Sequence, residues 1–382
     1  MISKALADHG ATVVRVESES RLETLRLVPP YKDGIAGINR TQFFANFNTS
    51  KLGLGLDLAN AEARKVARKL IDWADVVTDS FTPGTMKKWG LDYATISAGR
   101  PDLIMLSTCL RGQTGPEAAY TGFGGQGAML AGIHSITGWA DRPPAGPWGA
   151  YTDFIGPRFG VAALAAALRH RALTGQGQHV DLAQGEAGIH FIEPLLLDYT
   201  VNGRAAGPPG TRSLNESPHG VFQCLGDERY VAISVTDSAQ WRALVQTLKL
   251  NDFSEPAFDK LDARRASEDE IEAAIATWCC DHEPFAAAAK LKAAGVPASV
   301  VMRPTDLYED AQLAHRGFFV TLDHGEMGPT PYDGLVTRFS ATPGQLRNAA
   351  PCLGQDTHQV LTDFLGYNDD DIATLAAAGA IS

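Results

Sequence analysis

The stretch EARKVARKLIDWADVVTDSFTPGTMKKWGL (residues 62–91) decides the fold class. Apolar residues recur at helical spacing in its first half, with Val66, Leu70 and Trp73 on one face, and predict an amphipathic helix. The run DVVTDSF predicts a strand, and TPGT predicts a turn that opens another short helix. A second buried strand is expected in PDLIMLSTCL (Pro101–Leu110). This alternation is typical of βαβ units, which predict a parallel sheet with right-handed crossovers.

The alternation extends in both directions until about Gln184. ISKALADHG (Ile2–Gly10) predicts a short helix, ATVVRVE (Ala11–Glu17) a strand, and the alanine-rich run Phe154–Leu173 a long helix. The Gly-, Pro- and Ser-rich segment 201–219 then predicts a linker. GVFQCLGDERYVAISV predicts a hairpin, followed by helices and the strand VPASVVM. We therefore expect an α/β large domain over residues 1–200 and a smaller α+β domain over residues 220–320, with residues 321–382 returning to the large domain.

Composition excludes several classes of function. The chain has 33 basic and 44 acidic residues and no basic tract, so we expect no nucleic-acid partner and no membrane partner. An anionic ligand must then be held by local donors. No apolar run is long enough to span a bilayer, and the five irregularly spaced cysteines predict free thiols in a reducing cytoplasm. The ten histidines show no metal-ligand spacing, so no metal is expected.

Asp153, in GAYTDFIGPRF, precedes the long apolar run and allows two interpretations. Aspartate is a good helix N-cap, and Pro157 suits a first turn because the N–H that proline lacks is unpaired there anyway. If Gly156 is the cap instead, Asp153 stands just outside the helix. A carboxylate near a helix N-terminus also stays ionised and can attack an activated acyl group. Capping and catalysis are compatible.

GFGGQG contains the glycine spacing of dinucleotide-binding turns at Gly122, Gly124 and Gly127. The preceding strand should end near Leu110, too far upstream for that motif, and no acid follows at the required position. We favour a closely packed backbone segment. In DSFTPGTMKKWGL, backbone amides and lysines at the end of a strand could hold a phosphate; the alternative is an ordinary loop with solvated lysines.

Together these stretches resemble the family III CoA-transferases, which include formyl-CoA, carnitine and benzylsuccinate CoA-transferases. The matching motifs, in chain order, include LADHGATVVRVE, NTSKLGLGLDL, ADVVTDSFTPGTMKKWGLDY, RGQTGPEAAYTGFGGQGAMLAG, YTDF and RHRALTGQGQHVDLA. The resemblance spans nearly the whole chain. It implies transfer of CoA from an acyl-CoA to a free carboxylate, with CoA and acyl-CoA as substrates and no metal.

The resemblance also implies roles for residues. Asp153 would be the nucleophile, forming a mixed anhydride and then an aspartyl-CoA thioester. The positions that match CoA-binding residues of the family are Leu56, Asp57, Ser80, Phe81, Thr82 and Lys88. Positions expected near the substrate are Phe123, Gln126, His219 and Gly220.

The chain departs from formyl-CoA transferases at three places. Ser18 and Ser80 stand where those enzymes have arginine and asparagine, and NESPHGVFQC lacks their glycine run. Oxalate and formate are therefore disfavoured as substrates. The motifs SPHGVF and GAYTDFIGPRF are more similar to those of the family members that use larger organic or aromatic acids. Two alternatives stay open. One is an α-methylacyl-CoA racemase, although Phe123 stands where its histidine is expected. The other is a non-catalytic CoA-binding subunit.

For the architecture, the resemblance implies a Rossmann-like large domain and an interlaced homodimer, in which the long linker at residues 201–219 crosses the partner. Family members usually have a further strand and loop before the helix that contains LADHGA. We therefore expect a sheet without that strand and a partly open CoA pocket, or a start site assigned too late.

Overall fold

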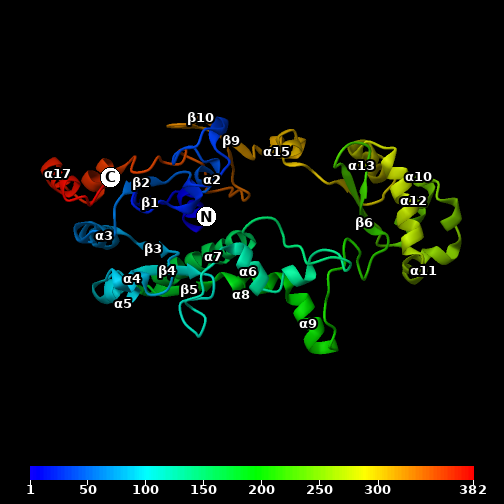
Figure 1. Ribbon diagram of the computed structural model, residues 1–382, viewed down its shortest axis with the longest axis horizontal. Helices are drawn as coiled ribbons and strands as arrows, with labels where there is room; N and C mark the ends of the chain where they lie inside the picture. The colour runs from blue at the N-terminus through cyan, green and yellow to red at the C-terminus, as the bar shows by residue number, and fades with distance from the viewer. The chain divides into compact units, whose positions relative to one another are not determined.

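The structure, a computed structural model, describes all residues from Met1 to Ser382 and divides into two compact units (Figure 1). The large unit contains Met1–Ile133, Gly146–Arg204 and Ala311–Ser382. The small unit contains His134–Ala145 and Ala205–Asp310. No helix in either unit is long and apolar enough to cross a membrane.

Parallel strands form the centre of the large unit, which confirms the predicted α/β class. β1 (Val14–Glu17) pairs with β2 (Leu52–Gly55). β3 (Val76–Asp79), β4 (Ile104–Cys109) and β5 (His179–Ala183) form a second sheet in that order, also parallel. The parallel strands lie in two sheets, because β1 and β3 are not hydrogen-bonded to each other.

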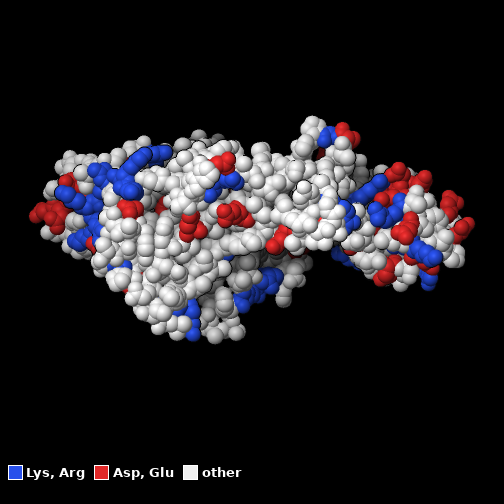
Figure 2. Space-filling model, turned by 90° about the horizontal axis from the view of Figure 1, so that it is seen from below, with Lys and Arg blue, Asp and Glu red and all other residues white.

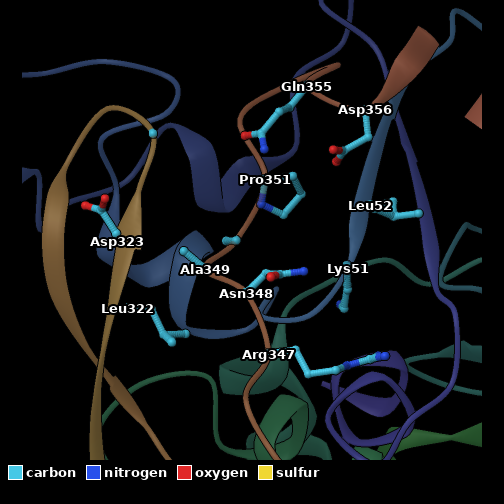
Figure 3. Close-up of a pocket in the computed structure, with 12 residues that line it drawn as sticks. Lys51, Leu52, Leu322, Asp323, Arg347, Asn348, Ala349, Pro351, Gln355 and Asp356 are labelled. Carbon is cyan, nitrogen blue, oxygen red and sulfur yellow. The ribbon is translucent and has the colours of Figure 1, made fainter. Parts of the chain in front are cut away.

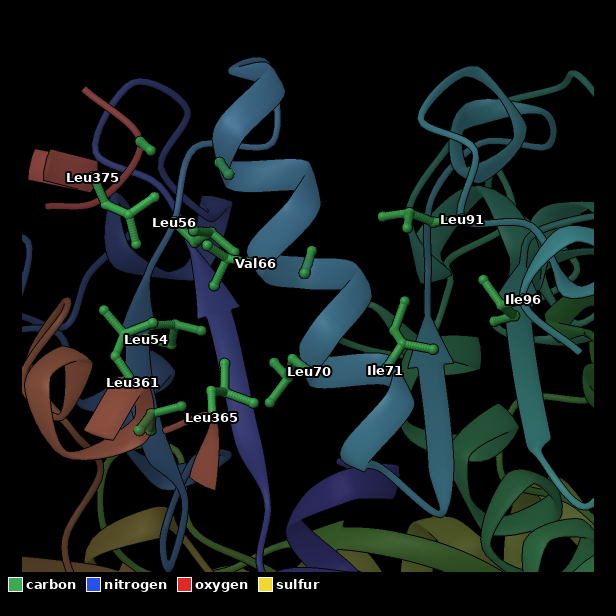
Figure 4. Packing of buried hydrophobic residues seen from close by; sticks show 14 of the residues in the cluster. Leu54, Leu56, Val66, Leu70, Ile71, Leu91, Ile96, Leu361, Leu365 and Leu375 are labelled. Atoms are coloured by element: carbon green, nitrogen blue, oxygen red, sulfur yellow. The ribbon is translucent and has the colours of Figure 1, made fainter. Parts of the chain in front are cut away.

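Helices cover both faces of β4. Successive side chains of a strand point to opposite faces of the sheet, so those of β4 belong alternately to two apolar clusters. Met105 packs with α3 (Ala61–Trp73), β2 and the C-terminal segment, and Figure 4 shows Leu54, Leu70 and Leu361 of this cluster close together. Ile104 and Leu106 pack instead with α1 (Ile2–Asp8) and α7 (Tyr151–Thr174).

One predicted core position of α3 is wrong. Val66 and Leu70 are buried, but Trp73 is 41% exposed and stacks on Phe364, with ring centroids 5.1 Å apart. Trp73 is the last residue of the helix and lies beyond its buried residues, the last of which is Ile71.

Shorter elements complete the large unit. The helices are α2 (Gln42–Asn46), α4 (Thr85–Lys88), α5 (Tyr93–Ile96), α6 (Gly124–Leu130), α8 (Gln184–Ile189), α9 (Glu193–Asn202), α15 (Ala311–Arg316), α16 (Thr357–Gln359) and α17 (Asp369–Ala377), with a π-helical turn at Val360–Phe364. β9 (Phe319–His324) and β10 (Gly328–Asp333) form an antiparallel hairpin.

The small unit is an α+β fold with its own core. β6 (His219–Gln223) and β7 (Tyr230–Ser234) form the predicted hairpin, and β8 (Ala298–Val300) pairs antiparallel with β7. The helices are α10 (Ser238–Leu248), α11 (Leu261–Ala266), α12 (Glu268–Cys280), α13 (Pro284–Ala293) and α14 (Pro304–Tyr308). The buried side chains of Trp241, Ile271 and Leu291 lie in this core.

The glycines of GFGGQG bring α6 against the start of α7. A Cβ atom at Gly124 would lie 2.4 Å from the Ala150 carbonyl oxygen, and one at Gly127 would lie 2.1 Å from Thr152 Oγ1. The expectation of a closely packed backbone segment is confirmed. The arrangement also differs from a dinucleotide-binding turn, because β4 ends at Cys109 and α6 begins only at Gly124.

This packing predicts different effects for two adjacent glycines. Gly124→Ala should lower the free energy of unfolding by about 1–3 kcal/mol, because its methyl group overlaps the backbone of α7. Gly125→Ala is the matched control, since a Cβ there would lie 4.0 Å from its nearest neighbour, the Gly149 oxygen. Urea unfolding of both variants measures the difference. Equal stability of the two variants would contradict the packing argument.

Candidate active site

Asp153 lies in the first turn of α7 and does not cap the helix. α7 begins at Tyr151, its N-cap residue is Ala150, and no side chain makes a cap hydrogen bond. The N-cap interpretation of Asp153 is therefore wrong. Pro157 lies inside the helix and not in its first turn. Because proline has no N–H, the helical hydrogen bond that would reach the Asp153 carbonyl is absent.

Neutral donors hold the Asp153 carboxylate. The Gly124 N–H donates to Asp153 Oδ2 at 2.9 Å, and the Gln184 side chain also hydrogen-bonds to the carboxylate. Burial raises the pKa of Asp153 above its usual 3.8, and these two hydrogen bonds oppose the rise only in part. The result is a half-buried carboxylate without a cationic partner, which is suited to nucleophilic attack.

The sequence did not single out Gln184 as a site residue. Gln184 is the first residue of α8, directly after β5, and its side chain lies against α7: a Cβ at Gly156 would be 3.2 Å from Gln184 Cγ. Its place directly after β5 is the signal that could have found it, since the carboxyl ends of parallel strands meet at one edge of a sheet, but this strand was not predicted from the sequence.

Asp153 belongs to the carboxyl edge of the second sheet. The Gly185 N–H donates to the carbonyl of Leu110, the residue after β4, at 3.0 Å. Cβ atoms at Gly122 and Gly127 would also touch the Leu110 side chain. α6, α7 and α8 thus meet where β4 ends, and ligands of parallel sheets bind at this edge.

The loop after β3 leaves the same edge and contains three of the predicted CoA-binding residues, and the helix α4 that follows it ends with a fourth, Lys88. Ser80, Phe81, Thr82 and Lys88 are all exposed. The Phe81 ring is 42% exposed and lies edge-on to Trp89, with centroids 5.2 Å apart. A cavity of about 190 Å³ adjoins this loop and is lined by Thr82 and Lys87, among others. Of these four residues, only Thr82 lines the cavity.

The two other predicted CoA-binding residues lie at the end of β2. The Leu56 side chain is only 1% exposed and is part of the core, so it is not available to a ligand. The Asp57 carboxylate accepts hydrogen bonds from Ser20 Oγ at 2.8 Å and from the Ala59 N–H at 2.9 Å.

The residues expected near the substrate are divided between the units. Phe123 is the N-cap residue of α6, adjacent to Gly124, and its N–H donates to Gln126 Oε1 at 3.0 Å. Its side chain is 60% exposed. His219 and Gly220 belong to β6 of the small unit, where His219 Nδ1 lies 2.5 Å from the Thr211 carbonyl oxygen.

The larger cavity of the large unit, about 370 Å³, contains none of the predicted site residues. Figure 3 shows it between the β9–β10 hairpin, with Leu322 and Asp323, and the start of β2, with Lys51 and Leu52. Lys51 Nζ donates to the Phe47 carbonyl and to Asn48 Oδ1, and burial holds its pKa well below the usual range.

The surface charges are mixed. On the face shown in Figure 2, Lys and Arg side chains alternate with Asp and Glu and form no continuous basic surface. This agrees with the formal net charge of −11. A phosphate-bearing ligand must therefore depend on local donors such as those of the loop after β3.

The family comparison covers most of the chain. The sequence model of CoA-transferase family III matches residues 1–357. A succinyl-CoA–D-citramalate CoA-transferase of Chloroflexus aurantiacus is 28% identical over 377 residues, with 98% of this chain and 92% of that enzyme covered. A succinate–glutarate CoA-transferase of Agrobacterium fabrum is also 28% identical, with 94% of this chain and 90% of that enzyme covered.

Solved structures agree with the sequence comparison. The crystal structure of a CAIB/BAIF family protein from Brucella suis superposes with a TM-score of 0.86 at 27% identity, covering 95% of this chain and 94% of that one. The fold, the family match and the named relatives agree. The chain therefore belongs to CoA-transferase family III and is a CoA-transferase.

Proposed function

We propose that the enzyme moves CoA from an acyl-CoA donor to a free carboxylic acid through covalent intermediates on Asp153. The observation that carries the proposal is the half-buried Asp153 carboxylate, held by Gly124 and Gln184 at the carboxyl edge of a parallel sheet. Relatives named for succinyl-CoA or succinate favour succinyl-CoA as the donor, with a second dicarboxylic acid as the acceptor.

The first half of the reaction transfers CoA to the enzyme. A carboxylate oxygen of Asp153 attacks the thioester carbonyl, the C–S bond breaks, and the CoA thiolate leaves a mixed anhydride behind. The thiolate then attacks the Asp153 carbonyl carbon and releases the donor acid. The product is an aspartyl-CoA thioester, which stays activated for acyl transfer, as an ester of serine would not.

The second half repeats these steps with the acceptor. Its carboxylate attacks the aspartyl thioester and displaces the thiolate, which then attacks the acceptor carbonyl and restores the Asp153 carboxylate. The Gly124 N–H bonds to Asp153 Oδ2, the oxygen that remains a carbonyl if Oδ1 attacks. A donor at that position stabilises the negative charge that develops on Oδ2 when the thiolate or the acceptor attacks the Asp153 carbonyl carbon.

The proposed assembly is an interlaced homodimer with the threaded linkers implied by the resemblance. α9 supports an extensive interface, because none of its residues is buried within the chain. Leu197, Tyr199 and Val201 on this helix are 57%, 61% and 78% exposed. Exposed apolar surface of this kind is typical of a covered face in an oligomer.

The racemase alternative is less well supported. Two-base proton transfer at the α-carbon needs a second group opposite the aspartate. The residue expected to supply it is Phe123, and the stretch YTGFGGQGA (residues 120–128) contains no histidine. Racemisation of a chiral 2-methylacyl-CoA in the absence of an acceptor acid would nevertheless favour that branch over CoA transfer.

Asp153→Asn should abolish CoA transfer, because a neutral amide cannot attack the thioester. The fold of the variant should be at least as stable as the wild type at neutral pH. Burial raises the pKa of Asp153 in the folded protein above its value in the unfolded chain. The free energy of unfolding therefore falls as the pH rises from the unfolded-state pKa through the folded-state pKa. At pH 7 the half-buried ionised carboxylate destabilises the fold, and the neutral asparagine does not. Transfer assays measure the loss of activity, and urea unfolding measures the stability of the variant.

A peptide adduct provides the direct test. Wild-type enzyme incubated with succinyl-CoA and digested should give a CoA or acyl adduct on the peptide that contains Asp153, and Asp153→Asn should give none. Full transferase activity of Asp153→Asn would remove Asp153 from the mechanism.

Activity should fall with decreasing pH as Asp153 becomes protonated. Because burial raises the pKa of this carboxyl, kcat/KM should decline at a pH above its ordinary value of 3.8. The pH profile of kcat/KM, with circular dichroism at each pH to show that the protein stays folded, measures this decline. A profile that stays flat down to the ordinary value would contradict the burial argument.

The dimer should persist when diluted to nanomolar concentration, because interlaced chains separate only after partial unfolding. Sedimentation and fluorescently labelled subunit exchange measure this directly. A monomer in rapid exchange would contradict interlacing but would leave the proposed chemistry of Asp153 untouched.

A further inference from the structure

A chain of hydrogen bonds crosses the second sheet behind the loop after β3. Ser107 Oγ, on β4, donates to Asp79 Oδ2 at 2.6 Å, and His179 Nε2, on β5, lies 3.0 Å from the same Oγ. The serine hydroxyl has one proton, which it gives to Asp79. It therefore accepts from His179, whose proton must be on Nε2.

The other oxygen of Asp79 holds the loop itself. Asp79 Oδ1 accepts the Phe81 N–H at 3.2 Å, so one carboxylate ties the loop backbone to the sheet. The Phe81 ring meanwhile stays exposed and is supported edge-on by Trp89. The hydrogen bond to Asp79 thus fixes the backbone of Phe81, while the Phe81 ring stays exposed and can contact a ligand.

The other end of this hydrogen-bond network, at Ser107 and His179, is also held in place. Ser107 is only 3% exposed, and the His179 ring stacks on Tyr93 of α5, with centroids 5.3 Å apart and planes 16° from parallel. Asp79, Ser107, Tyr93 and His179 line one cavity with Lys87 and Asp92. Burial raises the pKa of Asp79, while the hydrogen bonds from Ser107 and Phe81 favour its charged form.

We infer that Asp79 is a positioning residue for CoA, fixing the Phe81 backbone through a network with Ser107 and His179. This inference rests on the proposed function and on the expectation from the family resemblance that Phe81 binds CoA. Asp79 does not need to touch CoA. By holding the loop in one conformation before the ligand arrives, it lowers the entropy lost on binding.

Direct binding of free CoA tests the inference apart from catalysis. Isothermal titration should give a Kd for Asp79→Asn about tenfold weaker than for the wild type, since a charged hydrogen-bond acceptor is lost. Asp92→Asn is the matched control: Asp92 lines the same cavity, but its carboxylate accepts from Thr95 Oγ1 and does not hold the loop. Its Kd should match that of the wild type.

Kinetics separate a positioning role from general damage. Asp79→Asn should raise the KM for acyl-CoA and leave kcat within about twofold, because Asp153 and its partners are unchanged. Two variants at the exposed His179 avoid the buried part of the network. His179→Gln keeps an N–H that can reach Ser107 and should retain the wild-type KM, whereas His179→Leu should raise it.

Each outcome decides between hypotheses. Equal CoA affinities for the wild type and Asp79→Asn would overturn the positioning role but leave the proposed function intact. An equal loss in Asp92→Asn, or a fall in kcat at constant KM, would overturn it as well. A wild-type enzyme that binds neither CoA nor acyl-CoA would contradict the proposed function and this inference together.

Discussion

The contact between the backbones of α6 and α7 positions the candidate active site. Without a Cβ at Gly124, the start of α6 approaches the first turn of α7 closely enough for its N–H to reach the Asp153 carboxylate. The same approach buries Thr152, whose hydroxyl donates to the Gly124 carbonyl at 3.2 Å. The proposed nucleophile is thus oriented by helix packing, without a cap or an ion pair.

CoA is a polyanion, and the net charge of this enzyme is also negative. The chain has no continuous basic surface on the face shown in Figure 2, and its net charge opposes the approach of CoA. The structure instead offers short-range donors at one sheet edge: the loop after β3, Lys87, Lys88 and the neutral groups around Asp153. Neutral donors at the nucleophile leave its negative charge available for attack, whereas an arginine partner would stabilise the ground state.

The periodic parts of the fold could be predicted from the sequence, and the local geometry could not. The helix at residues 61–73, the strand before Ser80 and the hairpin of the small unit follow from apolar spacing and turn residues. The start of α7 was misplaced, because Pro157 was interpreted as a first-turn residue although α7 tolerates it in its interior.

For the candidate site, Asp153 and the loop after β3 were predicted from motifs, because their neighbours along the chain carry the signal, and both stay predictions. Gln184 could not be identified in this way. Its role depends on the contact between α7 and α8, which sequence spacing does not report. Leu56 shows the opposite failure, since the motif is present while the side chain belongs to the core.

The division of the parallel strands into two sheets has a further consequence. β3 has helices over both faces but a strand neighbour on one side only, and Val76 and Val77 are merely half-buried. Backbone groups along its free side take part in no ladder and need other partners. Amides bonded to water exchange their hydrogens faster than ladder amides. The amides on the free side of β3 are therefore expected to exchange their hydrogens faster than the amides of the ladder that β3 forms with β4.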